Sequence, residues 1–217
     1  MRKDLLVVGE VYHIFTRSIA DFKIFNNDDE FSRMLGVIKY YQCEKPAVKF
    51  SRFITLEENM QNNIRKDLSS EKEKLVTIIA YCLMPTHLHL ILKQLKQNGI
   101  SIFMSNILNS YTRYFNTKHK RKGPLWEARF KSVLVEKDEY LSHLTRYIHL
   151  NPVTASLIDK PEDWFASSYR EYIEKNAEKI CQYDDVLQAN PISYKQFVDN
   201  RISYQRELAK IKQYLFD

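Results

Sequence analysis

The sequence predicts an α+β sandwich in which a mainly antiparallel sheet of four strands carries helices on one face. Three observations favour this class. Four short segments are apolar or rich in β-branched and aromatic residues, and have the length of strands. Longer segments with apolar residues at helical spacing separate them. Two of the strands are joined by Pro85-Thr86, a turn-like pair that indicates a hairpin.

The first half of the chain supplies one strand, one helix and a polar segment. Residues 11–18 (VYHIFTRS) alternate and predict a strand. Residues 27–45 begin with Asn and Asp, which cap helices, and place Phe31 and Ile38 at helical spacing. Residues 51–74 are mostly polar, and we interpret them as a helical insert with a solvated tail.

The middle of the chain supplies the hairpin and a long helix. Residues 75–85 are apolar on both faces and predict a strand that a proline ends, and residues 87–95 predict the second strand. Residues 99–120 form an amphipathic pattern for which Ser101 is the expected N-cap.

The last third begins with a strand and a helix. Residues 128–136 predict the fourth strand, and residues 137–150 predict a helix that Asn151-Pro152 should end. We expect residues 153–217 to form a helical tail, because short proline-containing segments punctuate otherwise helical patterns.

Composition sets limits on the class of protein. The 217 residues carry a formal net charge of +6 and a pI of about 9.0, which suits either a polyanionic partner or a lysine-rich solvated surface. Three widely spaced cysteines favour buried free thiols in a reducing, cytoplasmic setting over a disulfide framework. We expect no signal peptide and no membrane span, because no cleavage site and no apolar run of 18 residues occur.

The first candidate for chemistry is the pair His87 and His89 on the predicted strand after the hairpin turn. Residues two apart on a strand point to the same face, so both imidazoles should project opposite to the face of Leu88 and Leu90. Two neutral imidazoles this close can share one metal ion. The alternative is a pair of half-buried histidines with ordinary hydrogen-bond partners.

The second candidate lies in the helix predicted over residues 137–150. Tyr147 and Asn151 are four residues apart and share one helical face, so a phenol and a neutral amide oxygen should lie one turn from each other. The alternative is that Tyr140, Leu144, Tyr147 and Leu150 pack against the sheet. A tyrosine hydroxyl can act as a covalent nucleophile toward a phosphodiester. Tyr111 and Tyr114 compete with Tyr147 for this role.

The third candidate is the stretch 111–131, in which seven basic side chains stand against one acid and aromatic residues lie between them. Basic side chains neutralise phosphates and aromatic rings stack on unpaired bases, so this pattern indicates nucleic-acid binding. A solvated turn after a helix with aromatics in the core would give a similar pattern, and we expect some of both. The candidate binding residues are Arg113, Lys118, Lys120, Arg121, Lys122, Trp126, Arg129 and Lys131.

Four motifs, in matching order and spacing, resemble those of a known family: YCLMPTHLHLILKQ, NSYTRYFN, GPLWEARFKS and YIHLNPV. The family is the single-strand transposases of bacterial insertion sequences, and the resemblance is closest to the REP-associated tyrosine transposases within the HUH (histidine–hydrophobic–histidine) nuclease superfamily. The resemblance spans roughly residues 5–170. It implies a catalytic domain over residues 1–170, with 51–74 as an insert, and a helical extension over 171–217.

The resemblance also implies a ferredoxin-like core that binds one divalent metal, with Mg²⁺ or Mn²⁺ as the expected ion. It assigns His87 and His89 as ligands and Tyr147 as nucleophile. Asn151 stands where insertion-sequence relatives place a Gln ligand. The implied substrate is single-stranded or hairpin DNA, and relatives act as monomers or as homodimers.

The resulting hypothesis is a transposase that cleaves and rejoins DNA strands through a 5′-phosphotyrosine intermediate. One alternative is a domesticated protein that binds DNA hairpins without turnover, although intact His87, His89 and Tyr147 disfavour it. Another is a relaxase or replication nickase, which the short chain and the lack of a helicase segment disfavour.

Overall fold

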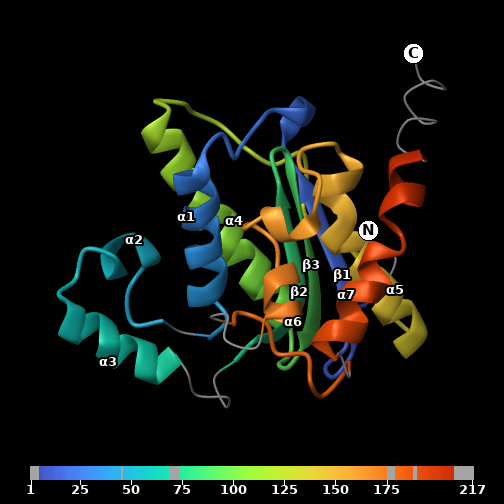
Figure 1. Cartoon of the computed structure of the whole chain (residues 1–217). Coiled ribbons are helices and arrows are strands. Elements are labelled where there is room, and N and C mark those ends of the chain that lie inside the picture. The colour runs from blue at the N-terminus through green and yellow to red at the C-terminus, as the bar shows by residue number, and fades with distance from the viewer. Residues whose placement is uncertain (1–4, 45, 69–73, 175–178, 188–189, 208–217) are drawn as a thin grey trace.

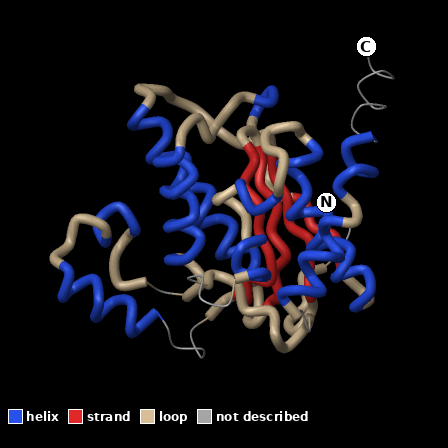
Figure 2. The backbone as a smooth tube through the Cα atoms, in the orientation of Figure 1, coloured by secondary structure: helices blue, strands red, loops and turns tan. Residues whose placement is uncertain are grey.

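Four strands form one antiparallel sheet at the centre of the computed structural model, which describes residues 5–44, 46–68, 74–174, 179–187 and 190–207. The strands are β1 (Val11–Arg17), β2 (Val76–Met84), β3 (His87–Gln94) and β4 (Lys131–Leu134). Their order across the sheet is β2-β3-β1-β4, and every neighbouring pair is antiparallel. Figure 2 shows the strands together, in red, with helices around them. The predicted α+β class with a four-stranded antiparallel sheet is confirmed.

The chain order of the elements reproduces the ferredoxin-like arrangement. Helix α1 (Asp28–Tyr40) connects β1 to β2, and α4 (Gly99–Lys118) connects β3 to β4. The two crossovers place β1 and β3 in the middle of the sheet and β2 and β4 at its edges, which is the ferredoxin-like pattern that the resemblance implied.

Helices cover both faces of the sheet, so the expectation of helices on one face was wrong. Helices α1 and α4 lie side by side on one face, and α5 (Asp138–Thr154) lies on the other with α6 (Tyr169–Ile173) and α7 (Pro191–Asp199) (Figure 1). The cause lies in β2 and β3, where residues pointing to either face are buried. Strands that are apolar on both faces need a cover on each.

The end of α5 differs from the prediction. The helix runs through Pro152 to Thr154, whereas the sequence predicted an end at Asn151-Pro152. A proline has a helical φ and removes only its own amide donor, and the next turn is closed by the Ala155 amide donating to the Asn151 carbonyl. Asn151 therefore has a fixed helical position one turn after Tyr147.

Three other boundaries also moved. Helix α1 ends at Tyr40, and β4 has four residues rather than the nine expected over 128–136. Asn98, in a left-handed conformation, occupies the N-cap position of α4 without a side-chain cap hydrogen bond, and Ser101, the expected cap, lies inside the helix. The reason is Gly99, where an added Cβ would lie 2.3 Å from the Leu75 carbonyl oxygen, so the helix begins in close contact with the chain that enters β2.

The polar insert is helical where the structure describes it. It contains α2 (Phe50–Phe53) and α3 (Glu58–Leu68), and residues 69–73 lie outside the described part. Phe50 fixes α2 to α1, because its ring contacts Gly36 and stacks under the Arg33 guanidinium at 4.6 Å.

The C-terminal segment is less helical than expected. Within its described part the segment contains α6, α7, a further helical run over residues 202–207 and one 3₁₀ turn, η3 (Pro161–Asp163). The earlier 3₁₀ turn η1 (Ile19–Asp21) follows β1. The segment adds to the edge of the sheet at β2, where the Ser168 amide donates to the Tyr81 carbonyl and the Tyr172 hydroxyl donates to the Ile79 carbonyl. Residues 208–217 of the predicted tail lie outside the described part.

The three thiols, Cys43, Cys82 and Cys181, are buried and none of them forms a disulfide within the described residues, as predicted. None of the helices in the described ranges has the length and apolar character needed to cross a membrane.

Candidate active site

His87 and His89 project from the same face of β3, as predicted. Their ring centroids lie 5.2 Å apart and the ring planes are nearly perpendicular, at 86°. Each ring already uses one nitrogen: His87 Nδ1 lies 3.0 Å from the Thr86 hydroxyl, and His89 Nδ1 lies 3.0 Å from Nε2 of His13. The Nε2 atom of each ring is therefore the nitrogen left for a further ligand.

His13 is a member of the site that sequence reasoning missed. It lies on β1, where Phe15 stands directly opposite His89, so His13 occupies the diagonal position on the same face. Alternation along VYHIFTR places His13, Phe15 and Arg17 on one face. That signal was present in the sequence, but the register between β1 and β3 was needed to connect it with the histidine pair.

Burial keeps the imidazoles of this site neutral. Desolvation lowers the pKa of His89 to about 3 and that of His13 to about 4. The pKa of His87 is also lowered, first by burial and then by the nearby Arg17 guanidinium. At neutral pH all three rings are in the form that can donate a nitrogen lone pair to a metal ion.

Tyr147 stands over the histidines from α5. Its ring centroid lies 6.1 Å from that of His89, with the planes at 84°. The ring is 44% exposed, and burial raises the pKa of its hydroxyl, so it is a phenol at neutral pH. The buried residues of α5 include Leu141, Leu144, Ile148 and Leu150. The alternative of packing against the sheet therefore fits Leu144 and Leu150, and does not fit the exposed Tyr140 and Tyr147.

Asn151 faces the same cavity from one turn further along α5. Its amide nitrogen is buried and has no hydrogen-bond partner among the described residues. A half turn about the bond to the amide group exchanges the positions of its oxygen and nitrogen. The oxygen can therefore be directed toward a cation, and this turn breaks no hydrogen bond of the nitrogen within the described residues. An amide with this freedom suits a ligand.

The cavity between β1, β3 and α5 has a volume of about 480 Å³. Its described lining includes three cationic side chains, Arg17, Arg129 and Lys131, and a single acid, Glu127. The remaining lining residues are His13, Phe15, Thr16, His87, His89, Ala128, Tyr147 and Asn151. A cavity lined by histidines and several cations can receive a phosphate group.

The donor set fits a divalent ion that takes several of its ligands from the substrate or water. Within the ranges that the structure describes, no group of three or more His, Cys, Asp or Glu side chains is arranged to hold a metal. His13 and Glu127 also line the cavity, and His87, His89 and the Asn151 amide are the donors that the sequence predicted. A set of two imidazoles and one neutral oxygen leaves positions open for phosphate oxygens.

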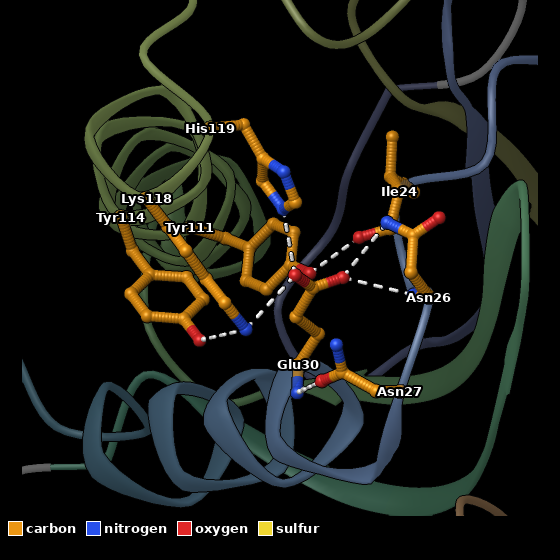
Figure 3. Close-up of polar contacts among 8 residues, drawn as sticks. All are labelled: Ile24, Asn26, Asn27, Glu30, Tyr111, Tyr114, Lys118 and His119. Carbon is orange, nitrogen blue, oxygen red and sulfur yellow. Dashed lines mark hydrogen bonds and ion pairs between the residues drawn. The ribbon is translucent and has the colours of Figure 1, made fainter.

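The predicted nucleic-acid-binding stretch divides into two parts. Arg129 and Lys131 line the cavity, while Lys118 lies at the end of α4 and forms an ion pair of 3.0 Å with the buried carboxylate of Glu30 (Figure 3). His119 contacts the same carboxylate at 2.7 Å. The positive charge of Lys118 is thus largely compensated within the protein.

Glu30 is the centre of this second cluster. Burial alone would raise its pKa, but the Asn26 backbone amide and side chain, together with His119 and Lys118, outweigh burial and lower the pKa to about 2. The carboxylate therefore stays charged and connects the first turn of α1 with the end of α4 (Figure 3). This contact fixes the start of the basic turn that follows α4.

The other members of the stretch have mixed surroundings. Arg121 donates to Asn116 Oδ1 and to the Pro124 carbonyl, and Trp126 is partly buried with its Nε1 donating to Thr112 Oγ1 at 3.1 Å. Arg113, Lys120 and Lys122 are exposed, and Phe115 lies in the core as expected.

The competing tyrosines lie elsewhere. Tyr111 is fully buried and donates to the Ile24 carbonyl, and the Tyr114 hydroxyl contacts the Lys118 ammonium. Both belong to α4, on the opposite face of the sheet from α5 (Figure 1). Of the described tyrosines, Tyr147 alone lines the histidine cavity.

The chain combines a ferredoxin-like sheet with paired histidines on a central strand and a tyrosine above them on a helix. Comparison with known proteins identifies the family to which this combination belongs. The family model of IS200-like transposases matches residues 11–151. The chain therefore belongs to the IS200-like transposase family, and the resemblance stated from the sequence motifs is confirmed.

Two relatives illustrate the match. A curated protein of Haemophilus influenzae named as a REP-associated tyrosine transposase is 28% identical over 102 residues, which cover 42% of this chain and 57% of that protein. The match thus spans little more than half of the relative's length. A solved structure of a REP-associated tyrosine transposase bound to a REP hairpin superposes with a TM-score of 0.52 at 16% identity, covering 88% of this chain and 95% of that one. This second likeness supports the fold.

Proposed function

We propose that the protein is a metal-dependent DNA transposase that cleaves and rejoins single-stranded or hairpin DNA, with Tyr147 as the nucleophile. The observation that carries the proposal is that Tyr147 lines one basic cavity together with His87, His89 and Asn151, although β3 and α5 are far apart in sequence. Membership of the IS200-like family supports the same activity.

His87, His89 and Asn151 would hold a divalent ion, for which Mg²⁺ or Mn²⁺ is proposed. When bound, the ion would supply a Lewis acid that polarises the scissile phosphate. The neutral state of both histidines supports this assignment, as does the Asn151 amide nitrogen, which has no hydrogen-bond partner among the residues that the structure describes. The chain's cationic residues Arg129 and Lys131 would orient the phosphate from the rim of the cavity.

Tyr147 would attack phosphorus through its phenolic oxygen. A phosphorus–oxygen bond to Tyr147 forms, the bond from phosphorus to the 3′ oxygen breaks, and the products are a 5′-phosphotyrosine and a free 3′ hydroxyl. The phenolic proton passes to solvent, to which the half-exposed ring is open, and the 3′ oxygen takes up a proton. Attack by a second 3′ hydroxyl reverses the step and joins strands.

The substrate is proposed from chemistry and likeness together. Three cations against one acid in the described lining favour a polyanion. The structural relative was solved with a REP hairpin, which suggests a folded single strand as the substrate of this chain as well. The exposed Arg113, Lys120 and Lys122 would contact flanking phosphates.

The test is a covalent-adduct assay. Purified protein is incubated with a single-stranded hairpin oligonucleotide and Mn²⁺ or EDTA, and denaturing gels resolve the protein–DNA adduct. The wild type should form the adduct with Mn²⁺ and not with EDTA, and Tyr147→Phe should bind the hairpin without forming it.

The matched control is Tyr140→Phe, because Tyr140 lies on the same helix, is 45% exposed and is absent from the lining of the cavity. This variant should keep the adduct. Hairpin binding by the wild type without any adduct would instead identify a binding protein that does not turn over. An adduct in Tyr147→Phe would remove the proposed nucleophile.

A further inference from the structure

We infer that His13 is a positioning residue that holds His89 in the tautomer and orientation needed to present Nε2 to a metal ion. This inference rests on the proposed function, because it gives a role to a residue next to a proposed ligand. Neither the sequence motifs nor the family resemblance had drawn attention to β1 as part of the site.

The first step is the contact itself. Nε2 of His13 and Nδ1 of His89 lie 3.0 Å apart, and both side chains are buried, at 8% and 9% exposure. The ring planes are inclined by 20° and the centroids lie 5.2 Å apart. Rings that are nearly parallel, with two nitrogens this close, meet edge to edge through a hydrogen bond rather than face to face.

The second step is the proton. A hydrogen bond between two neutral imidazole nitrogens needs one donor and one acceptor. If His89 donates from Nδ1, its Nε2 keeps a lone pair for a cation, and His13 accepts on Nε2. A metal-ligating histidine usually donates its other ring N–H in this manner, which fixes the ring and increases its basicity.

The third step is the rigidity of the contact. The register pairs His13 with Ile91 and Phe15 with His89, so two central strands of the sheet set the separation of the rings. His87 has a corresponding partner in the Thr86 hydroxyl at 3.0 Å. Nδ1 of each proposed histidine ligand therefore has a hydrogen-bond partner. For His89 the partner is His13 on the neighbouring strand, and for His87 it is Thr86 in the turn before β3.

The test measures metal affinity rather than cleavage. Binding of MnCl₂ is followed by titration calorimetry for the wild type, His13→Phe, His13→Gln and His143→Phe, with circular dichroism as the check of folding. His13→Phe keeps a ring of similar size but cannot hydrogen-bond, so its Kd should rise by roughly 10- to 100-fold. His13→Gln can still accept a hydrogen bond and should recover part of the affinity.

His143 serves as the control because it lies on the exposed side of α5, outside the lining of the cavity, and contacts Arg146 and Phe197. Its variant should bind Mn²⁺ within twofold of the wild type. A folded His13→Phe that also binds within twofold would overturn the role of His13 while leaving the proposed metal site intact.

A second measurement, on the wild-type protein, tests the tautomer of His89 without any variant. In ¹⁵N NMR spectra of the wild-type protein, His89 should be the Nδ1–H tautomer; an Nε2–H tautomer would overturn the inference. Separately, His89→Ala should abolish Mn²⁺ binding. If the wild type bound no Mn²⁺, or if His89→Ala bound it normally, the proposed metal site would fail and the role of His13 with it.

Discussion

Tyr147 stands edge-on to His89, with ring centroids 6.1 Å apart, and both belong to the same chain. The helix that carries Tyr147 is also fixed to its own chain on its other side. His149, two residues further on, is fully buried. Its Nδ1 lies 2.7 Å from the Tyr194 hydroxyl, and its Nε2 lies 2.7 Å from the Ser168 hydroxyl. We predict from these contacts that the site is completed within one chain.

This arrangement predicts the outcome of a complementation experiment. His89→Ala and Tyr147→Phe, each inactive alone, should stay inactive when mixed and co-incubated with hairpin DNA and Mn²⁺, because neither chain supplies a whole site. Adduct formation by the mixture would show that two chains exchange α5, and that the active species is a homodimer.

The two parts of the basic stretch should differ in function. Arg129→Gln with Lys131→Gln removes two cations from the cavity, and should slow adduct formation even at saturating DNA. Lys120→Gln with Lys122→Gln removes two exposed cations outside the cavity lining, and should weaken hairpin binding while leaving the saturated rate unchanged.

Salt titrations provide the measurement for both pairs. For every single-strand phosphate that a variant no longer neutralises, the slope of log K against log salt should become shallower by about 0.7. An unchanged slope in the Lys120 and Lys122 variant would mean that these residues form only a solvated turn.

Buried His149 predicts a loss of stability in acid. Burial lowers its pKa from 6.5 to about 3, so the folded protein keeps it neutral while the unfolded chain binds a proton below pH 6.5. Its contribution is therefore complete above pH 6.5 and decreases by about 1.4 kcal/mol per pH unit on acidification toward pH 3.

Urea unfolding between pH 7.5 and 4.5 measures the effect. His149→Gln can still hydrogen-bond Ser168 and Tyr194 but does not titrate, so its stability should depend less on pH than that of the wild type. His13 and His89 shift in the same direction, so some pH dependence should remain. Equal slopes for the two proteins would contradict the role of His149.

Glu30 should be a major contributor to stability among the acidic residues of α1. Glu30→Gln leaves the partners of a buried carboxylate with a neutral acceptor, and should lower the free energy of unfolding by roughly 1.5–3 kcal/mol. Asp29→Asn, at an exposed position in the same first turn, is the matched control and should change it by less than about 0.5 kcal/mol. Similar losses in the two variants would show that the cluster around Glu30 is not special.

The position of most strands and helices along the chain was predictable, because the spacing of apolar residues differs between the two. The strands β1, β2 and β3 and the long helix α4 were found near their observed bounds, and the turn at Pro85-Thr86 identified the hairpin. Helices on the second face were not anticipated, although residues 75–85 are apolar on both faces and such a strand needs a cover on each. The hydrophobic pattern does not say which helix covers which face.

The placement of the candidate side chains was predictable where residues are close in sequence, and was not predictable where the sheet register brings them together. The spacing of His87 and His89, and of Tyr147 and Asn151, was enough to place each pair on one face. His13 and Arg17 join them only through the pairing of β1 with β3. The ion pair of Lys118 with Glu30 was not predicted, because the two residues are 88 positions apart in the sequence.

The central claim is that the oxygen of Tyr147 forms the bond to DNA, and mapping the adduct tests it most directly. The covalent complex formed with hairpin DNA and Mn²⁺ is digested with nuclease and protease, and the peptide that carries the nucleotide is sequenced by mass spectrometry. We predict a 5′-phosphotyrosine at Tyr147. A nucleotide on Tyr111, Tyr114 or Tyr140, or on a side chain other than tyrosine, would contradict the mechanism.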